Sequence, residues 1–308
     1  MKIIAGIHNI RKCDRAVVAL GVFDGLHRAH QFILRKTSLQ ARLAGVKSIA
    51  LTFYPHPHAR KSIYSLDHRL RLIASTGIDI CIVINFSREF SQMNAEDFIR
   101  DILVKKIGAG YIYIGKNYKF GRGGRGDYRT LLRLGRIYNF RVKILQVIKS
   151  GIRPVSSTLL RKLITLGELA EARKLLSRRV SVLGTVIEGT RLGKRLGFPT
   201  ANINPHHEVL PPPGIYAVWI IYKRKRLKGL CYIGRKPTFR IHSPQPAAYR
   251  RTFIEVYIYN FRKNIYGEDL EIQFISRIRG DKKFPDPAAL VKQIKKDITC
   301  AKPLFSRP

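Results

Sequence analysis

The chain has 308 residues, of which 45% are hydrophobic and 25% are charged, and its mean hydropathy is −0.11. Such a chain can bury a core in one large or two ordinary domains. No stretch approaches the roughly 18 apolar residues of a membrane span, and the start carries too short an apolar run for a secretory signal. The four cysteines are scattered, which disfavours a disulfide framework and a structural metal site. We therefore expect a cytoplasmic protein with no membrane partner.

The net charge of +38 is extreme and admits nucleic acids, anionic membrane surfaces or polyanionic small molecules as partners. The positive excess is spread over both halves of the chain, and no basic tail or single basic helix carries it. We therefore expect nonspecific RNA or DNA binding at low salt but no specific nucleic-acid partner. The sequence says nothing about oligomeric state.

The most informative stretch, Gly21 to His30, reads Gly-Val-Phe-Asp-Gly-Leu-His-Arg-Ala-His. It follows an apolar run, residues 16 to 20, that is typical of a strand buried on both faces of a parallel sheet. Gly21 and Gly25 indicate a turn, and the apolar spacing after it predicts a helix from Arg28 onward. We expect His27 and His30 in the first turn of that helix, pointing the same way.

Backbone N–H groups of this turn, the positive end of the helix dipole and two imidazoles would together hold a polyphosphate, most naturally that of a nucleotide. A capped helix carrying two surface histidines is the alternative. A zinc site is disfavoured because no nearby residue supplies a further ligand.

Further strands and helices alternate along the first half. We expect strands at 47–53, 78–86, 111–115 and 141–148, and helices at 66–75, 94–106 with Asn94 as N-cap, and 128–134. With the first strand, this is the five-stranded signature of a doubly wound parallel sheet. The Tyr-Pro-His-Pro-His loop (54–58) and a glycine-rich basic loop (115–127) follow strands, where ligands bind in such sheets. The second loop could be a phosphate and base clamp or an RGG-like RNA contact.

A second phosphate site is expected at Val-Ser-Ser-Thr-Leu-Leu-Arg, residues 155 to 161. Ser156 or Ser157 can cap the following helix, and the hydroxyls with Arg161 can bind phosphate at its N-terminus. Capping alone is the alternative. The helical pattern continues to residue 176 with a break at Gly167.

Near residue 178 the pattern changes to β-rich runs at 180–186, 215–222, 227–233, 253–258 and 270–275, with one helix at 287–298. We expect an α/β domain over residues 1–178, followed by a small antiparallel β-barrel with a C-terminal helix over residues 179–308.

The second domain contains its own glycine-rich motif between residues 189 and 202. Gly189, Gly193 and Gly197 stand at a spacing of four and would let the backbone approach phosphates closely. Thr200 and Asn202 then offer two neutral oxygens on one side of an extended segment, which suits Mg²⁺ carried by a nucleotide. A glycine-rich hairpin with a proline bend is the alternative.

Taken together, the motifs resemble those of the bacterial bifunctional riboflavin kinase/FMN adenylyltransferase (FAD synthetase) family over nearly the whole chain. The matching segments are residues 21–30, 55–57, 115–121, 156–161, 197–202, 210–218, 233–239, 254–261 and 266–267. The resemblance implies a Rossmann-like nucleotidyltransferase domain followed by a kinase barrel. The implied substrates and products are ATP, riboflavin, FMN and FAD, with Mg²⁺ as cofactor.

For the first domain, the resemblance implies attack of an FMN phosphate oxygen on the α-phosphorus of ATP, with loss of pyrophosphate. It assigns His27 and His30 to the ATP phosphates and Arg161 to the opposite side. The wider ATP-binding set would be Gly21, Phe23, Asp24, Gly25, Asn117, Ser156, Ser157 and Thr158. Positioning and charge neutralisation would suffice for this chemistry, without a protein nucleophile.

For the second domain, the resemblance assigns Thr200 and Asn202 to Mg²⁺-ATP, with Gly189, Gly193, Gly197 and Pro199 beside the nucleotide. Glu255 would be the general base that takes the proton from the ribityl 5′-hydroxyl of riboflavin. A salt bridge to a nearby arginine is the alternative role for Glu255.

One position departs from the family pattern, because Ala29 stands where the family has glycine between its two histidines. A methyl group there could crowd the phosphates slightly or simply be tolerated in a helix. One alternative is therefore a riboflavin kinase with an impaired adenylyltransferase domain. The others are a nucleotidyltransferase for another phosphate acceptor, which the type of the first domain allows, and a nucleic-acid-binding protein, which the charge of +38 and the Gly/Arg loop at 121–126 suggest.

Overall fold

The computed structural model describes residues 1–57, 62–146, 149–150, 153–189, 192–206, 209–235 and 252–306. His58, the expected strand end at 147–148, residues 190–191 of the glycine-rich motif and residues 236–239 of a family motif lie outside these ranges. The chain forms two compact units, Met1–Ser157 and Thr158–Pro308.

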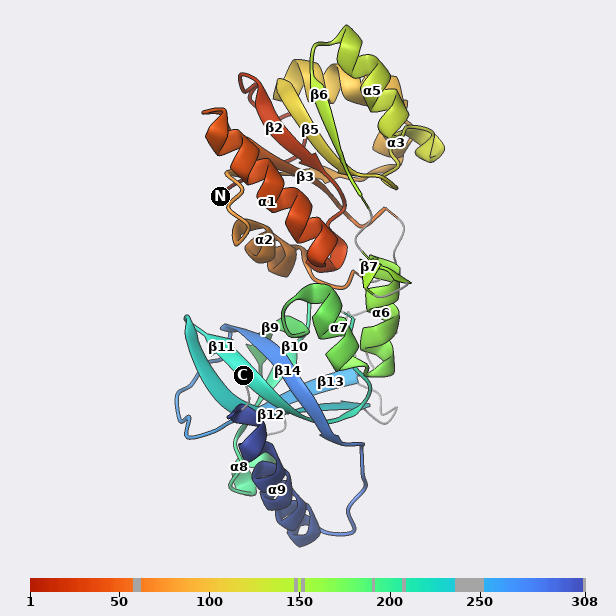
Figure 1. Ribbon diagram of the computed structural model, residues 1–308. Coiled ribbons are helices and arrows are strands. Elements are labelled where there is room, and N and C mark those ends of the chain that lie inside the picture. The colour runs from red at the N-terminus through yellow and green to blue at the C-terminus, as the bar shows by residue number, and fades with distance from the viewer. Residues whose placement is uncertain are drawn as a thin grey trace. The chain divides into compact units, whose positions relative to one another are not determined.

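The first unit is built on a parallel sheet of six strands in the order β1-β4-β3-β2-β5-β6 (Figure 1). The strands are β1 (Lys2–Ala5), β2 (Ala16–Leu20), β3 (Ser48–Tyr54), β4 (Ile80–Asn85), β5 (Ala109–Gly115) and β6 (Arg141–Leu145). The doubly wound parallel sheet is thus confirmed. The expected number of strands was wrong, because the four-residue edge strand β1 is mostly exposed and lacks a buried pattern.

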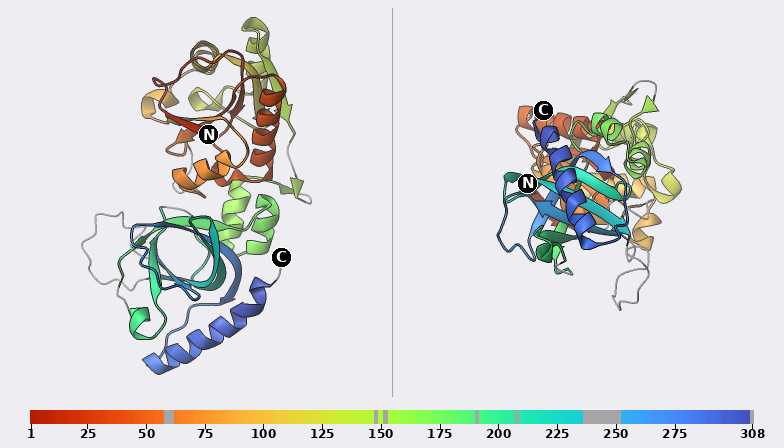
Figure 2. Two further views of the ribbon diagram at one scale, coloured as in Figure 1. Left: turned by 90° about the vertical axis from the view of Figure 1, so that its left-hand side faces the viewer. Right: turned by 90° about the horizontal axis from the view of Figure 1, so that it is seen from below.

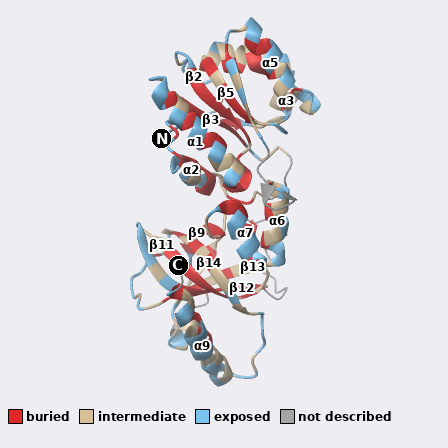
Figure 3. Ribbon diagram, in the orientation of Figure 1, coloured by how far each residue is buried: buried red, intermediate tan, exposed pale blue. Residues whose placement is uncertain are grey.

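Helices cover both faces of this sheet. They are α1 (Arg28–Leu43), α2 (Leu66–Ala74), α3 (Arg88–Ser91), α4 (Ala95–Asp97), the π-helix η2 (Phe98–Ile107) and α5 (Tyr128–Ile137), with single turns η1 (Asp24–Leu26) and η3 (Arg122–Gly124). Successive residues of β2 alternate between two core clusters. Val17 and Ala19 pack with residues of α1 and α2, and Val18 and Leu20 with residues of η2 and α5. The central strands are buried on both faces (Figure 3).

The helix expected at 94–106 is instead a short α-helical turn followed by the π-helix η2. Asn94 occupies the N-cap position, but its side chain does not cap the backbone there. Its Nδ2 donates to the Asp97 carboxylate at 3.4 Å, so the expectation of side-chain capping was wrong. A hydrophobic pattern cannot separate these helix types, because both bury residues three to four apart.

The second unit contains a closed antiparallel barrel in the order β10-β13-β12-β11-β14-β9, as expected for its fold class. Its strands are β9 (Ser181–Ile187), β10 (Thr200–Asn204), β11 (Gly214–Tyr222), β12 (Lys225–Arg235), β13 (Thr252–Ile258) and β14 (Asp269–Arg279). Figure 2 shows the strands closing into a ring with helix α9 (Pro287–Ala301) outside it. The strand β10 was anticipated only as an extended segment, because its sequence Thr-Ala-Asn-Ile-Asn is mostly polar.

Helices α6 (Ser157–Leu166) and α7 (Leu169–Leu176) precede the barrel and are separated by Gly167, as expected. The compact units divide between Ser157 and Thr158, so nearly all of α6 and the whole of α7 belong to the second unit. The division near residue 178 that the sequence pattern suggests stays a prediction about functional domains. Shorter elements are β7 (Lys149–Ser150), β8 (Arg153–Pro154), α8 (Leu192–Arg195) and η4 (Lys302–Phe305).

Candidate active sites

The first site is the turn between β2 and α1. Phe23 is fully buried in the left-handed backbone region (φ 53°), and Gly25 has φ 75° inside η1. A side chain at position 25 would be strained, which explains the glycine there. Gly21 is also constrained, because a Cβ on it would lie 2.7 Å from the Phe23 ring.

The two histidines of this turn lie together at the start of α1, as predicted. Their rings stack with centroids 3.7 Å apart and an interplanar angle of 21°. The Phe23 ring packs edge-on against His30 with a centroid separation of 5.4 Å. His27 is the N-cap residue rather than a member of the first helical turn, so its expected place inside the helix was wrong by one position. The helix dipole and both imidazoles therefore meet at one point.

Asp24 faces inward and is 1% exposed. Its Oδ1 accepts a hydrogen bond from the Ile63 N–H at 2.8 Å, and its Oδ2 lies 3.7 Å from His56 Nε2. The Asp24 carbonyl accepts a hydrogen bond from the Ser157 hydroxyl at 2.7 Å. Asp24 thus ties the turn to the loop after β3 and to the residue that begins α6, which brings these motifs together at the carboxyl edge of the sheet.

Asn117 lies exposed in the turn that follows β5, also beyond the carboxyl end of its strand. The basic loop after it folds back on itself through a bridge between Phe120 and Gly126, and the Arg122 N–H donates to the Met93 carbonyl at 2.8 Å. Thr158 and Arg161 belong to the second unit. Ser157 and Arg161 are four residues apart in α6 and so share a helix face.

Two side chains under the turn were missed from the sequence. Arg69 of α2 is 1% exposed, and its guanidinium donates to the carbonyls of Val22 at 3.0 Å and Phe53 at 2.9 Å. The Thr52 hydroxyl donates to the same Val22 carbonyl at 2.8 Å. The sequence does indicate that Arg69 is buried, because it interrupts the apolar spacing of residues 66, 70 and 73 on the buried face of α2.

The second site lies on the wall of the barrel. Asn202 of β10 pairs directly with Glu255 of β13, and Glu255 pairs in turn with Tyr232 of β12. Directly paired residues of antiparallel strands point to the same side of a sheet. The three side chains therefore form a row across neighbouring strands.

This row faces outward. Thr200 pairs with Tyr257, which pairs with Leu230, and Leu230 packs in the cluster that α9 forms against the outside of the barrel. The alternate residues Ile254 and Val256 are buried on the opposite face of β13. Thr200, Asn202 and Glu255, which the sequence places in one site, are thus brought together on the outer surface.

The glycines of the second motif make room for these side chains. A Cβ on Gly189 would lie 1.9 Å from Asn202 Nδ2, and one on Gly193 would lie 2.4 Å from the Phe198 carbonyl and 3.0 Å from Thr200 Oγ1. Gly197 has φ 83° and no atom close to its missing Cβ. Two of the three glycines are therefore needed for close packing and the third for its backbone conformation.

Tyr232 borders Glu255 and donates from its hydroxyl to Asp281 Oδ1 at 2.9 Å. Burial raises the pKa of Tyr232 well above its usual value, and the carboxylates of Asp281 and Glu255 raise it further. The phenol is therefore protonated at neutral pH and can act only as a hydrogen-bond donor or neutral acceptor near Glu255.

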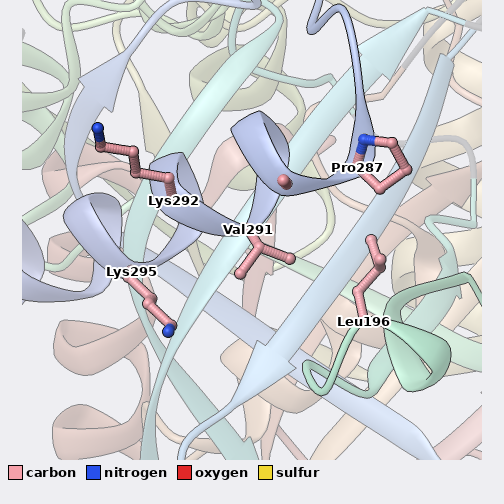
Figure 4. Close-up of a pocket in the computed structure, with 6 residues that line it drawn as sticks. Leu196, Pro287, Val291, Lys292 and Lys295 are labelled. Carbon is pink, nitrogen blue, oxygen red and sulfur yellow. The ribbon is translucent and has the colours of Figure 1, made fainter.

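A cavity of about 430 Å³ opens beside the same glycine-rich segment (Figure 4). Leu196 borders it from the loop before β10, and residues of α9 form the rest: Pro287, Ala288, Val291, Lys292 and Lys295. Its lining is mostly apolar and includes the two lysines, and it is open to solvent.

No cluster of three or more His, Cys, Asp or Glu side chains that could hold a metal is found in the part of the chain that the structure describes. Mg²⁺ usually keeps several waters and binds through one or two protein oxygens plus substrate phosphates. The outward Thr200 and Asn202 oxygens fit that mode of binding.

Comparison with known proteins gives a separate family match for each half of the chain. Residues 10–159 match a family described as FAD synthetase, and residues 176–305 match one described as riboflavin kinase. A bifunctional riboflavin kinase/FMN adenylyltransferase of Buchnera aphidicola subsp. Schizaphis graminum (strain Sg) is 33% identical over 316 residues, covering 99% of both chains. The chain belongs to the bifunctional riboflavin kinase/FMN adenylyltransferase family.

Other members are similar over the same extent. The bifunctional riboflavin kinase/FMN adenylyltransferase of Escherichia coli (strain K12) is 31% identical over 315 residues, covering 99% of this chain and 98% of that one. A solved structure from Streptococcus pneumoniae, described as a macrolide-efflux protein, has a TM-score of 0.83 at 26% identity, covering 98% of this chain and 99% of that one. The family and enzyme class expected from the sequence are confirmed. None of the described helices is both long and apolar enough to cross a bilayer.

Proposed function

We propose that the barrel unit of this bifunctional enzyme phosphorylates riboflavin to FMN with ATP, and that the first unit transfers an adenylyl group from ATP to FMN, giving FAD and pyrophosphate. The observation that carries the kinase assignment is the register that sets Asn202 directly opposite Glu255. The stacked histidines at the start of α1 support the adenylyltransferase site in the same way.

In the kinase reaction, the riboflavin 5′-hydroxyl attacks the γ-phosphorus of ATP, its proton passes to Glu255, and ADP leaves. Glu255 is half-buried in β13 with the neutral Tyr232 beside it, and it would accept the proton as the general base. Thr200 and Asn202 would hold Mg²⁺, which when bound offsets the negative charge of the transferring phosphate. Gly189 and Gly193 leave the room that the Asn202 and Thr200 side chains occupy.

In the adenylyl transfer, an FMN phosphate oxygen attacks the α-phosphorus of ATP, and the bond from that phosphorus to the β-phosphate breaks to release pyrophosphate. His27 and His30 donate to the phosphates at the positive end of α1 and stabilise the charge that develops there. Gly21, Phe23 and Gly25 shape the turn. Asn117, Ser156, Ser157, Thr158 and Arg161 are proposed to complete the nucleotide site.

A direct test separates the two reactions within one chain. The purified protein is incubated with riboflavin, ATP and Mg²⁺, or with FMN, ATP and Mg²⁺, and FMN and FAD are followed by chromatography. Glu255→Gln should lower the rate of FMN formation by at least about a hundredfold and leave FAD formation from FMN intact. His30→Ala should lower the rate of FAD formation from FMN and leave FMN formation from riboflavin intact. Formation of neither product by the unaltered chain would contradict the assignment.

Ala29 is examined in the same assay. Alanine favours a helix over glycine by about 1 kcal/mol, and position 29 lies in the first turn of α1. We expect Ala29→Gly to change the rate of FAD formation by less than about threefold, because the helix and the histidine stack tolerate a methyl group here. A much larger gain in FAD formation would favour the alternative of a kinase with an impaired adenylyltransferase.

The cytoplasmic location expected from the sequence stays a prediction.

A further inference from the structure

Arg69 is a buried charge for which the two reactions above have no role. It lies in α2, whose first turn is capped by the Ser65 hydroxyl, and α2 packs against the turn η1. Burying a guanidinium is costly unless its charge and its donors are satisfied. A residue that bears this cost directly under the phosphate-binding turn calls for an explanation.

The contacts of Arg69 are made to the ends of two neighbouring strands. One guanidinium nitrogen donates to the Val22 carbonyl and another to the Phe53 carbonyl. Val22 immediately precedes the left-handed Phe23, and Phe53 is followed by the loop that carries His56. Arg69 therefore cross-links the two loops that meet at the nucleotide site. A left-handed conformation at a non-glycine residue costs roughly 1 to 3 kcal/mol and persists only where its surroundings hold it.

The positive charge of Arg69 gives a second reason for its burial under the turn. Burial lowers the pKa of the Arg69 guanidinium, and the Asp24 carboxylate is the strongest of the influences that raise it. Arginine nevertheless stays protonated in proteins. Asp24 is equally buried and lies in the very turn where a triphosphate is proposed to bind. Without a nearby cation, its negative charge would repel that ligand through a medium of low dielectric constant.

We propose that Arg69 is a positioning residue for adenylyl transfer, which holds the Val22 and Phe53 carbonyls under the turn and offsets the charge of Asp24 where the ATP phosphates bind. The inference rests on the proposed function of the first unit. It predicts two separable effects, one on the geometry of the turn and one on the affinity for a polyanion.

The test measures FAD formation from FMN with riboflavin absent, so that the kinase site is idle, and determines KM for ATP and kcat. Arg69→Met removes the charge at similar volume, and we expect it to raise KM for ATP about tenfold or more. Arg69→Lys keeps the charge but cannot make both fork-like bonds, so KM should stay within about threefold while kcat falls. FMN formation by the same molecules reports that the barrel unit is intact, and far-UV circular dichroism reports whether the first unit is folded.

Thr52→Val is the matched control, because it deletes the other donor to the Val22 carbonyl without changing charge. If the role of Arg69 were only to hold that carbonyl, Thr52→Val and Arg69→Met would raise KM for ATP alike, and this would overturn the charge part of the proposal. The double variant Asp24→Asn/Arg69→Met should return KM for ATP toward that of the unaltered enzyme. A purely structural role would not produce that recovery.

Two further outcomes are decisive. Unchanged KM and kcat in Arg69→Met would overturn the proposal for Arg69. In that case, loss of FAD formation in His30→Ala would still support the proposed adenylyltransferase site. Full FAD formation by His30→Ala would instead show that the proposed site is wrong. If Arg69→Met fails to fold, Arg69→Lys decides alone: a KM for ATP within about threefold supports the proposal, and a tenfold rise overturns it.

Discussion

At the scale of single residues, the barrel site depends on the absence of side chains as much as on their presence. Gly189→Ala would place a methyl group on the Asn202 amide, which has no room to receive it without leaving its place opposite Glu255. We expect kcat/KM for riboflavin phosphorylation to fall at least about tenfold, a loss that corresponds to 1.4 kcal/mol. FAD formation from FMN should be unaffected.

Gly197→Ala is the control for this substitution. It adds the same methyl group in the same segment, but nothing lies within 4 Å of the added atom, and only the backbone strain at φ 83° opposes it. That strain costs roughly 1 to 2 kcal/mol and acts on stability rather than on Asn202. Equal losses of kinase activity in the two variants would show that the packing of Asn202 is not what Gly189 protects.

At the scale of elements, the starts of β3 and β4 are joined by a reciprocal pair. The Ser48 N–H and hydroxyl both donate to Asp79 Oδ2, at 2.9 and 2.7 Å, and the Asp79 N–H donates to Ser48 Oγ at 2.9 Å. Burial by itself raises the pKa of Asp79, but the hydrogen bonds from Ser48 and the charge of Lys47 outweigh it and lower the pKa below its usual 3.8.

A group with a lowered folded pKa stabilises the fold above its unfolded pKa and loses that effect as the pH falls through the folded value. Asp79→Asn should therefore lower the free energy of unfolding at pH 7 by no more than about 1 kcal/mol, because the carboxylate is exposed and screened. The difference from the unaltered protein should vanish near pH 2. Urea unfolding of the first unit, followed by far-UV circular dichroism at both pH values, tests this, and a constant difference would contradict it.

Helix α9 is fixed to the barrel by a second pair. Arg279 of β14 donates from Nε and Nη2 to the 3% exposed side chain of Asp297, and Gln293 Nε2 donates to Asp297 Oδ1 at 2.8 Å. Asp297→Ala leaves a half-buried guanidinium without its partner, and we expect a loss of about 3 kcal/mol.

Tryptophan fluorescence can measure this loss of stability. Trp219 is the only tryptophan in the sequence and packs in the cluster that α9 forms with the barrel, 5.1 Å from the Phe305 ring. Its fluorescence should report the shift in urea midpoint. The double variant Arg279→Met/Asp297→Ala should recover part of the stability, and failure to do so would show that the helix is held by its apolar contacts instead.

These elements also show what a sequence can and cannot predict. Buried strands such as β2 were located correctly because five consecutive apolar residues have few other uses in a soluble domain. The strand β1 was missed because it lies exposed at an edge, and β10 was anticipated only as an extended segment because its residues are mostly polar. The pairing of Asn202 with Glu255 could only be guessed at by resemblance, and Arg69 contacts carbonyls far along the chain, which no local pattern encodes.

At the scale of the whole molecule, the net charge of +38 stays unexplained by either site. We expect the protein to bind a mixed-sequence single-stranded DNA at about 50 mM salt, with an affinity that falls steeply and linearly on a log–log plot as salt increases. Fluorescence anisotropy measures this binding. Binding that persisted at about 500 mM salt or preferred one sequence would contradict the expectation and favour a dedicated nucleic-acid site.

Successive side chains of β13 point to opposite faces of the barrel wall, and this affects how mutations can alter the enzyme. Glu255 and Tyr257 face outward, on the side of the proposed kinase site, while Ile254 and Val256, one residue away, fill the interior. Mutations that repack the interior and mutations that alter substrate choice therefore fall on different positions of the same strand. A library that varies only the inward residues should yield barrels of altered heat resistance with the same substrate preference, which makes stability and specificity two separately adjustable traits here.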